Sequence, residues 1–195
     1  MRAVDLQVVV DRLEAAFAEA DLTVEARVAL DRVFARLQRP ASAGQNTGEA
    51  LEVVALMRLA LGDLAGKGAA LAGLAEALSD LAPRLAWTTR KRIGPTASEG
   101  FAIAHANAML IGPGGLEERE DVWLGLSLMA PNTRYPDHDH APEEVYLALS
   151  EGAFQHGEAD WLPRTAGQSF HNTPGIRHAM RSGGTPFLAL WCLPV

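Results

Sequence analysis

The feature that most constrains the fold is a change in hydrophobic period near residue 84. Before that point, apolar residues recur at spacings of three and four, which is typical of helices that bury one face. One such stripe consists of Leu6, Val9, Leu13, Ala16 and Phe17. After Trp87, short runs alternate every second residue between turn-forming stretches such as "IGPGGLEERED" and "RSGGTP". We therefore predict an α-helical region over residues 1–84 and a mainly β region, a small barrel or sandwich, over residues 85–195.

The helical region divides into four expected helices, separated by loop-forming residues. They cover residues 6–17, 23–38, 49–61 and 70–82. The loop "ASAGQNTG" is rich in Gly, Ser and Asn and is a credible linker. Because isolated short helices are marginal in water, their apolar stripes need a partner. That partner is either the barrel or a second subunit, so a homodimer is one open arrangement.

Composition limits the class of protein. With 195 residues and 48% hydrophobic content, the chain can bury a substantial core. The formal net charge of −7, without a basic cluster interleaved with aromatics, argues against a nucleic-acid partner. Asp5 and Asp11 interrupt the first apolar run, and no apolar stretch is long enough to span a bilayer, so we expect a cytoplasmic protein without a membrane partner. Cys192 is the single cysteine, and its apolar surroundings predict a buried, inert thiol.

The stretch "RYPDHDHAPEEVYLALSEG" gathers chemistry-bearing residues within a few positions. If the segment from 138 to 149 is largely extended, residues of equal parity face the same side. One face would carry His138, His140, Glu144 and Tyr146. The other face would carry Val145, Leu147 and Leu149. Pro142 marks a bend that weakens this parity argument.

These side chains are suitable ligands for a metal ion. Two imidazoles and a carboxylate bind divalent transition metals and leave coordination positions open for water or substrate. His178, in the turn-rich "HNTPGIRHAM", is a fourth ligand from a distant segment. We expect one ion per chain, and imidazole with carboxylate suits Zn, Fe, Mn, Co and Ni alike.

The remaining histidines are assigned structural roles. His105, in "AIAHANAM", is expected to be a packed or hydrogen-bonded strand residue. His156 is placed in a hairpin loop. His171 is either structural or a residue that orients a ligand imidazole.

The pattern H-x-H-x3-E followed by P-G-x-x-H resembles the two metal-binding motifs of the cupin superfamily. The resemblance covers residues 85–195 and implies a small β-barrel with the metal inside. Pro174 and Gly175 are adjacent here, whereas one residue usually separates them in the second cupin motif, but the spacing from Gly175 to His178 is kept.

Tyr135 and Tyr146 flank the first motif, and this fuller pattern is similar to the cupin-type dimethylsulfoniopropionate lyases. That similarity implies a β-elimination giving dimethyl sulfide and acrylate from a small-molecule substrate whose carboxylate binds the metal. A tyrosine would remove the proton alpha to that carboxylate, and a neighbouring cation favours the phenolate. Sequence ranks the two tyrosines only weakly, with Tyr135 slightly preferred as the base.

The chemistry also calls for an aromatic wall beside the cationic sulfonium group. The candidates for that wall are Trp123, Phe154 and Trp191. Two other functions stay open at this point. One is an Fe(II) dioxygenase that uses the same ligand set, and the other is a non-catalytic, metal-dependent module that binds a small molecule.

Overall fold

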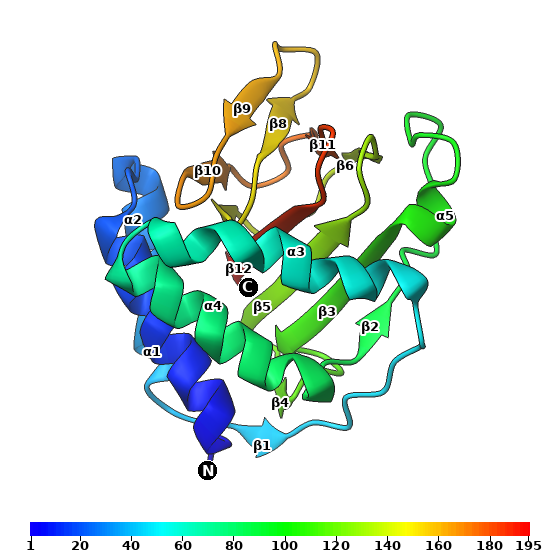
Figure 1. Ribbon diagram of the computed structural model, residues 1–195. Helices are drawn as coiled ribbons and strands as arrows, with labels where there is room; N and C mark the ends of the chain where they lie inside the picture. The colour runs from blue at the N-terminus through cyan, green and yellow to red at the C-terminus, as the bar shows by residue number, and fades with distance from the viewer.

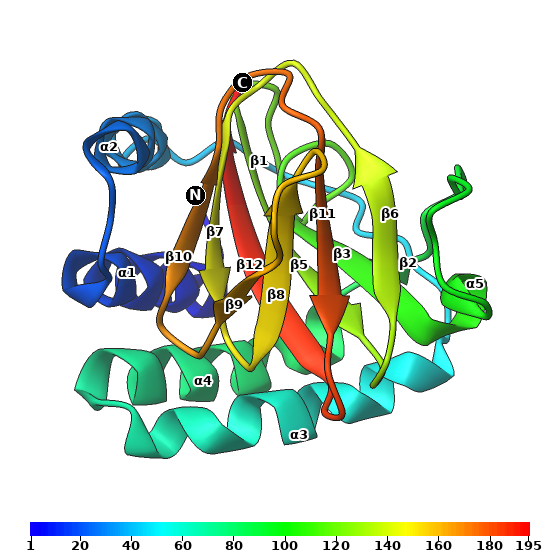
Figure 2. The ribbon, with the colours of Figure 1, turned by 90° about the horizontal axis from the view of Figure 1, so that it is seen from above.

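The computed structural model describes residues 1–195, the side chain of Asp63 excepted. The helices of residues 1–84 lie on one side of the strands, and the strands form two β-sheets (Figure 1, Figure 2). The chain therefore consists of a helical layer placed on a two-sheet barrel. This arrangement confirms the predicted fold class, a cupin β-barrel preceded by an α-helical region.

Four helical segments occur where the periodicity predicts them. The α-helices in these four segments are α1 (Val4–Glu19), α2 (Val24–Leu37), α3 (Met57–Leu61) and α4 (Ala69–Leu81), and a short fifth helix outside them is α5 (Phe101–Ala104). The third predicted helix is broken, because tighter 3-10 turns flank α3 at η1 (Glu52–Leu56) and η2 (Gly62–Gly66), and a third turn is η3 (Ala82–Arg84). Thr23 caps α2, since its hydroxyl accepts a hydrogen bond from the Ala26 amide at 3.2 Å.

The strands form one large and one small sheet. Their bounds are β1 (Ser42–Ala43), β2 (Trp87–Thr88), β3 (His105–Ile111), β4 (Glu117–Glu118), β5 (Val122–Met129), β6 (Arg134–His138), β7 (Glu144–Ala148), β8 (Gly152–His156), β9 (Leu162–Arg164), β10 (Ser169–Asn172), β11 (His178–Ser182) and β12 (Phe187–Pro194). The eight-stranded sheet has the order β1-β4-β3-β5-β12-β7-β10, with β2 paired to β3. The four-stranded sheet has the order β6-β11-β8-β9.

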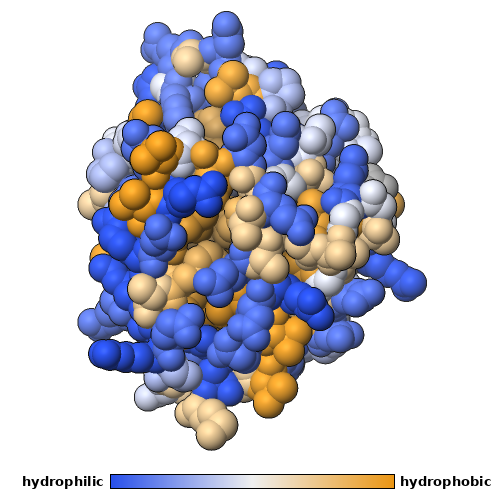
Figure 3. Space-filling view, turned by 90° about the vertical axis from the view of Figure 1, so that its left-hand side faces the viewer, coloured by the Kyte–Doolittle hydropathy of each residue, from blue (hydrophilic) through white to orange (hydrophobic). Residues whose placement is uncertain are grey.

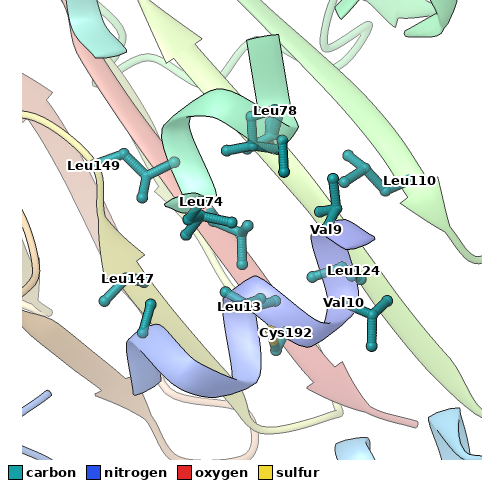
Figure 4. Close-up of a cluster of buried hydrophobic side chains, with 14 of the residues drawn as sticks. Val9, Val10, Leu13, Leu74, Leu78, Leu110, Leu124, Leu147, Leu149 and Cys192 are labelled. Carbon is teal, nitrogen blue, oxygen red and sulfur yellow. The ribbon is translucent and has the colours of Figure 1, made fainter. Parts of the chain in front are cut away.

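The helices pack on the outer face of the eight-stranded sheet. Alternate residues of its strands, such as Leu188, Leu190 and Cys192 of β12, join the helix side chains in one buried cluster. Figure 4 shows Leu13 of α1 and Leu74 of α4 within this core. The helices thus pack against the barrel, as one of the two predicted arrangements required. The division at residue 84 stays a prediction, because both parts contribute to a single core.

Two surface properties follow from this packing. The molecular face seen in Figure 3 is largely hydrophilic, with scattered hydrophobic groups, as is usual for a surface in water. Among the helices that the structure describes, none has the length and apolar character needed to cross a membrane.

The segment from 138 to 149 is not one extended strand, and its break includes Pro142, where a bend was expected. Residues 139–143 form a connection, β6 lies in the small sheet and β7 lies in the large one. Within β7 the predicted alternation holds, because Val145 and Leu147 face the helical core while Tyr146 belongs to the second, interior cluster. The histidines and Glu144 converge because two sheets face each other, and not because they share one strand.

Candidate metal centre

A cavity of about 210 Å³ opens into the barrel interior. It is lined by Arg90, Asn107, Met109, Trp123, Ser127, Tyr135, His138, His140, Glu144, Tyr146, Trp191 and Leu193. His178 lies beside this cavity and is almost fully buried. The structure therefore brings the four predicted ligands and both predicted tyrosines to one place.

Three imidazoles form the centre of the site. One ring nitrogen from each of His138, His140 and His178 lies within 4.8 Å of the others. His138 ends β6 and His178 begins β11, and the two residues are directly paired in the small sheet. His140 follows β6, and its carbonyl accepts a hydrogen bond from the Gly175 amide at 3.0 Å, which ties the two motifs together.

The hydrogen bonds behind these rings fix which nitrogen faces the centre. The Nδ1 atom of each ring lies near a backbone carbonyl oxygen: Pro136 at 3.0 Å, Pro142 at 2.7 Å and Ile176 at 2.9 Å for His138, His140 and His178 respectively. A carbonyl can only accept, so each Nδ1 carries the proton. In a neutral ring the lone pair is then on Nε2, which is the form that binds a metal ion.

Burial favours the neutral form of His138. Removal of its ring from water, and then the nearby His178, lower the pKa of His138 to about 3. For His140, burial opposes the charged form, but the hydrogen bond and charge of Glu144 outweigh it and raise the pKa. A bound cation would therefore compete with a proton for His140.

Glu144 supplies the negative charge of the centre. Its Oε2 lies 3.1 Å from His140 Nε2 and 3.3 Å from His178 Nε2. Burial disfavours the carboxylate, yet the His140 and His178 rings beside it hold the pKa of Glu144 far below its usual range. The group within 4.8 Å comprises the imidazoles alone, so Glu144 approaches from the side of His140 and His178.

These residues fit a divalent metal ion. Among the described side chains, His178 Nε2 is buried and lacks a hydrogen-bond partner of good geometry. A buried polar nitrogen without a partner costs about 1 to 3 kcal/mol, a cost that coordination would remove. Three imidazole lone pairs and an ionised carboxylate are a donor set that transition metals take.

The two tyrosines differ in their hydrogen bonds. The Tyr135 oxygen accepts from Asn107 Nδ2 at 3.2 Å, and Asn107 Oδ1 accepts from the Ser127 hydroxyl at 2.8 Å. The Tyr146 phenol is fully buried next to Glu144. Burial, and then the charge of Glu144, raise the pKa of Tyr146 well above its ordinary value of 10.0. Without a bound cation, Tyr146 is thus a protonated phenol.

Comparison with known proteins assigns the chain to a family. The family described as dimethylsulfoniopropionate lyase matches residues 25–189 of the chain. The chain belongs to the dimethylsulfoniopropionate lyase family. The resemblance seen in the tyrosine and histidine motifs is confirmed.

The chain is also similar to individual proteins. A curated protein of Cereibacter sphaeroides, DddL, named for a proposed dimethylsulfoniopropionate lyase activity, is 34% identical over 119 residues, which are 60% of this chain and 49% of that protein. The chain thus spans about half the length of this curated relative.

Two solved structures share the fold. The crystal structure of the dimethylsulfoniopropionate lyase DddQ from Ruegeria pomeroyi matches with a TM-score of 0.74 and 23% identity, over 98% of this chain and 91% of that one. A crystal structure described under the lyases RdDddP and RnDddQII matches with a TM-score of 0.73 and 21% identity, over 98% and 92% of the two chains. Because both sequence identities are below 25%, this similarity is evidence for the fold alone.

Of the three aromatic residues predicted for the wall, two lie at the cavity. Trp123 and Trp191 line the cavity, and a Cβ on Gly125 would collide with the Trp191 ring. Glycine at that position therefore leaves room for the indole beside β5. Phe154 lies elsewhere, packed behind Tyr146 with ring centroids 4.9 Å apart and only 1% exposed. Phe154 is therefore separated from the cavity by Tyr146 and does not form part of its lining.

Sequence reasoning missed polar residues of the cavity, among them Arg90, Asn107 and Ser127. The guanidinium carbon of Arg90 lies 5.5 Å from the centroid of the Tyr135 ring. The backbone amide of Arg90 donates to His105 Nε2 at 2.8 Å. The alternation in "HANAM" was a signal for Asn107, whereas Arg90 is in a loop without a recognisable pattern.

The three other histidines have distinct places. His105 is fully buried and stacks on Phe101 with centroids 3.7 Å apart, so its predicted structural role is confirmed. His156 is the last residue of β8 and not part of a hairpin loop. His171 bonds Glu143 at 3.2 Å, away from the metal centre. Its neighbour Asn172 is the one that contacts a predicted ligand.

Proposed function

We propose that this protein is a metal-dependent lyase that cleaves dimethylsulfoniopropionate by β-elimination, giving dimethyl sulfide and acrylate. The observation that carries the proposal is the convergence of three imidazole Nε2 atoms and two tyrosines on one cavity, in a chain of the dimethylsulfoniopropionate lyase family. The cavity volume of about 210 Å³ suits a small substrate.

His138, His140, Glu144 and His178 would hold the metal ion. The chemistry that such an ion supplies is neutralisation of the negative charge that builds up on the substrate carboxylate during deprotonation. The backbone carbonyls behind the three rings keep each Nε2 directed at the centre. The protein contributes this orientation before substrate arrives.

Tyr135 is proposed as the base. A phenolate is favoured by hydrogen bonds donated to its oxygen, and Asn107 donates one. Asn107 is in turn held by Ser127, whose Oγ accepts from the Trp191 indole nitrogen at 3.1 Å. The Tyr135 oxygen would take the alpha proton, the C–H electrons would form the carbon–carbon double bond, and the C–S bond electrons would leave with neutral dimethyl sulfide.

Tyr146 is proposed as the partner on the metal side of the cavity. Its buried, protonated phenol lies beside Glu144 and can donate a hydrogen bond to an anionic group. The two tyrosines would then divide their roles between proton acceptor and hydrogen-bond donor.

The two charged ends of the substrate match the lining. Trp123 and Trp191 offer indole faces for the sulfonium cation. Arg90 contributes a guanidinium that stabilises negative charge on the substrate carboxylate. A zwitterion is therefore matched at both ends.

The direct test uses chelator-stripped protein reloaded separately with Zn, Fe, Mn, Co or Ni. Addition of dimethylsulfoniopropionate should release dimethyl sulfide into the headspace from at least one loaded sample and from none of the stripped ones. Oxygen uptake without dimethyl sulfide release would support the dioxygenase function instead. The proposal would be contradicted if the protein binds none of these metals, or if no metal-loaded sample releases dimethyl sulfide.

A further inference from the structure

A buried amide stands directly behind the carboxylate of the metal centre. Asn172 ends β10 and is paired across the strands with Glu144 of β7. Its side chain is fully buried, and its Nδ2 donates to Glu144 Oε2 at 2.9 Å. This is the same oxygen that approaches His140 and His178.

The other end of the amide meets a histidine of the opposite sheet. His156 Nε2 lies 2.8 Å from Asn172 Oδ1. His156 ends β8, where it is paired with His178 of β11. The Asn172 side chain therefore links the large sheet, which carries Glu144, to the small sheet, which carries two of the imidazoles.

The direction of these hydrogen bonds is determined by chemistry. An ionised carboxylate only accepts, so Asn172 must present its NH₂ group to Glu144 and its carbonyl oxygen to His156. His156 must then donate from Nε2–H. The two bonds run in one direction, from His156 to Asn172 to Glu144.

The position of His156 is also fixed from outside. Its ring packs on Phe170 with centroids 4.4 Å apart. It lines an outer cavity of about 590 Å³ that also includes Asp21, Glu25 and Arg164. The ring thus lies between an accessible surface and the interior, and can be changed without opening the core.

We propose that Asn172 and His156 are positioning residues that hold the Glu144 carboxylate in its metal-binding orientation. This inference rests on the metal site of the proposed function. Glu144 Oε2 has two imidazoles on one side, and without the amide it could rotate toward either of them. Loss of a group that orients a metal ligand typically weakens metal affinity by about 10- to 100-fold.

The test measures Zn²⁺ affinity by calorimetric titration of the metal-stripped protein. Asn172→Leu removes the amide at similar volume and should weaken Zn²⁺ binding by about 10- to 100-fold. His156→Phe keeps the aromatic contact but cannot donate, and should weaken binding by about tenfold. His156→Gln offers an NH₂ donor to Asn172 and should restore affinity close to the unmutated protein.

His171→Phe is the matched control, because His171 neighbours Asn172 and bonds Glu143. It should leave Zn²⁺ affinity unchanged. The visible absorption of the Co²⁺-loaded proteins should change in Asn172→Leu and His156→Phe alone, since it reports the arrangement of ligands. A purely structural role would move the melting temperature of the stripped protein and leave this spectrum unaltered.

The outcomes separate the inference from the proposal beneath it. If the unmutated protein binds no Zn²⁺, the metal site itself fails and the inference fails with it. If that protein binds Zn²⁺ and Asn172→Leu binds it equally well, only the inference is overturned. Should Asn172→Leu fail to fold, the two His156 variants provide the test. Equal Zn²⁺ affinity in His156→Phe and His156→Gln would overturn the role of the hydrogen bond from His156 to Asn172.

Discussion

The two faces of the eight-stranded sheet are made by the same strands but carry different kinds of side chain. On β7, Val145 and Leu147 face the helices and join a continuous apolar core. Glu144 and Tyr146, one residue away, face the cavity. A step of one residue along a strand therefore separates the side chains that stabilise the fold from those proposed to perform the chemistry, and substitutions on the two faces should have different consequences.

The largest effect is expected from His140→Ala on the cavity face. Losing one imidazole removes a metal ligand and, with it, neutralisation of the substrate carboxylate. Metal content measured by elemental analysis should fall to near zero, and lyase activity should be abolished. The apolar face is untouched, so the stripped variant should melt at about the temperature of the stripped parent protein. Full metal occupancy in His140→Ala would show that the ligand assignment is wrong.

The next effect is expected at the tyrosines. Tyr135→Phe removes a single hydroxyl, so folding and metal content should survive while turnover falls by about two to four orders of magnitude through loss of the general base. The measurement is the initial rate of dimethyl sulfide release at saturating substrate.

Tyr146→Phe is the internal comparison for this prediction, and it should reduce turnover less than Tyr135→Phe. A larger loss of turnover in Tyr146→Phe would show that Tyr146 is the base and Tyr135 the hydrogen-bond donor. Near-normal turnover in both metal-loaded variants would exclude elimination by a tyrosine base.

Substitutions on the face of the sheet that packs against the helices should lower stability and leave turnover unchanged. Leu74 of α4 is fully buried in the shared core, and Leu74→Ala should lower the free energy of unfolding by about 2 to 5 kcal/mol through lost burial and the cavity left behind. Denaturant unfolding of the stripped protein measures that loss. Turnover per bound metal ion should stay unchanged below the unfolding transition. A matching fall in turnover would show that the two faces are coupled.

Sequence predicted one of these faces better than the other. The apolar periodicity of the helices and of β7 is a local property, so it could be followed along the chain. The proposed metal ligands were predicted from a motif. The assumption that His138, His140 and Glu144 share one extended segment was wrong, because nothing local shows that residues 139–143 carry the chain from one sheet to the other. Nothing in the sequence indicated that Asn172, and not His171, contacts Glu144, because this depends on the register of β10 on β7.

The smallest predicted effect on turnover is at Asn107, whose side chain connects Tyr135 to Ser127 by hydrogen bonds. Its amide donates to the Tyr135 oxygen at 3.2 Å and accepts from Ser127 at 2.8 Å. Asn107→Ala keeps the phenol but removes one donor to it, and a hydrogen bond to a charged group contributes about 1.5 to 3 kcal/mol. Part of that is recovered by water in the half-buried position, so turnover should fall by about tenfold, equal to roughly 1.4 kcal/mol.

The decisive measurement for Asn107 is a double-mutant cycle with Tyr135→Phe. If Asn107 acts only through the Tyr135 oxygen, adding Asn107→Ala to Tyr135→Phe should cost no further turnover. If the two losses multiply, Asn107 contributes to turnover independently of the Tyr135 oxygen. Arg90, whose guanidinium carbon lies 5.5 Å from the centroid of the Tyr135 ring, is then the next group to test as the support for Tyr135 as the base.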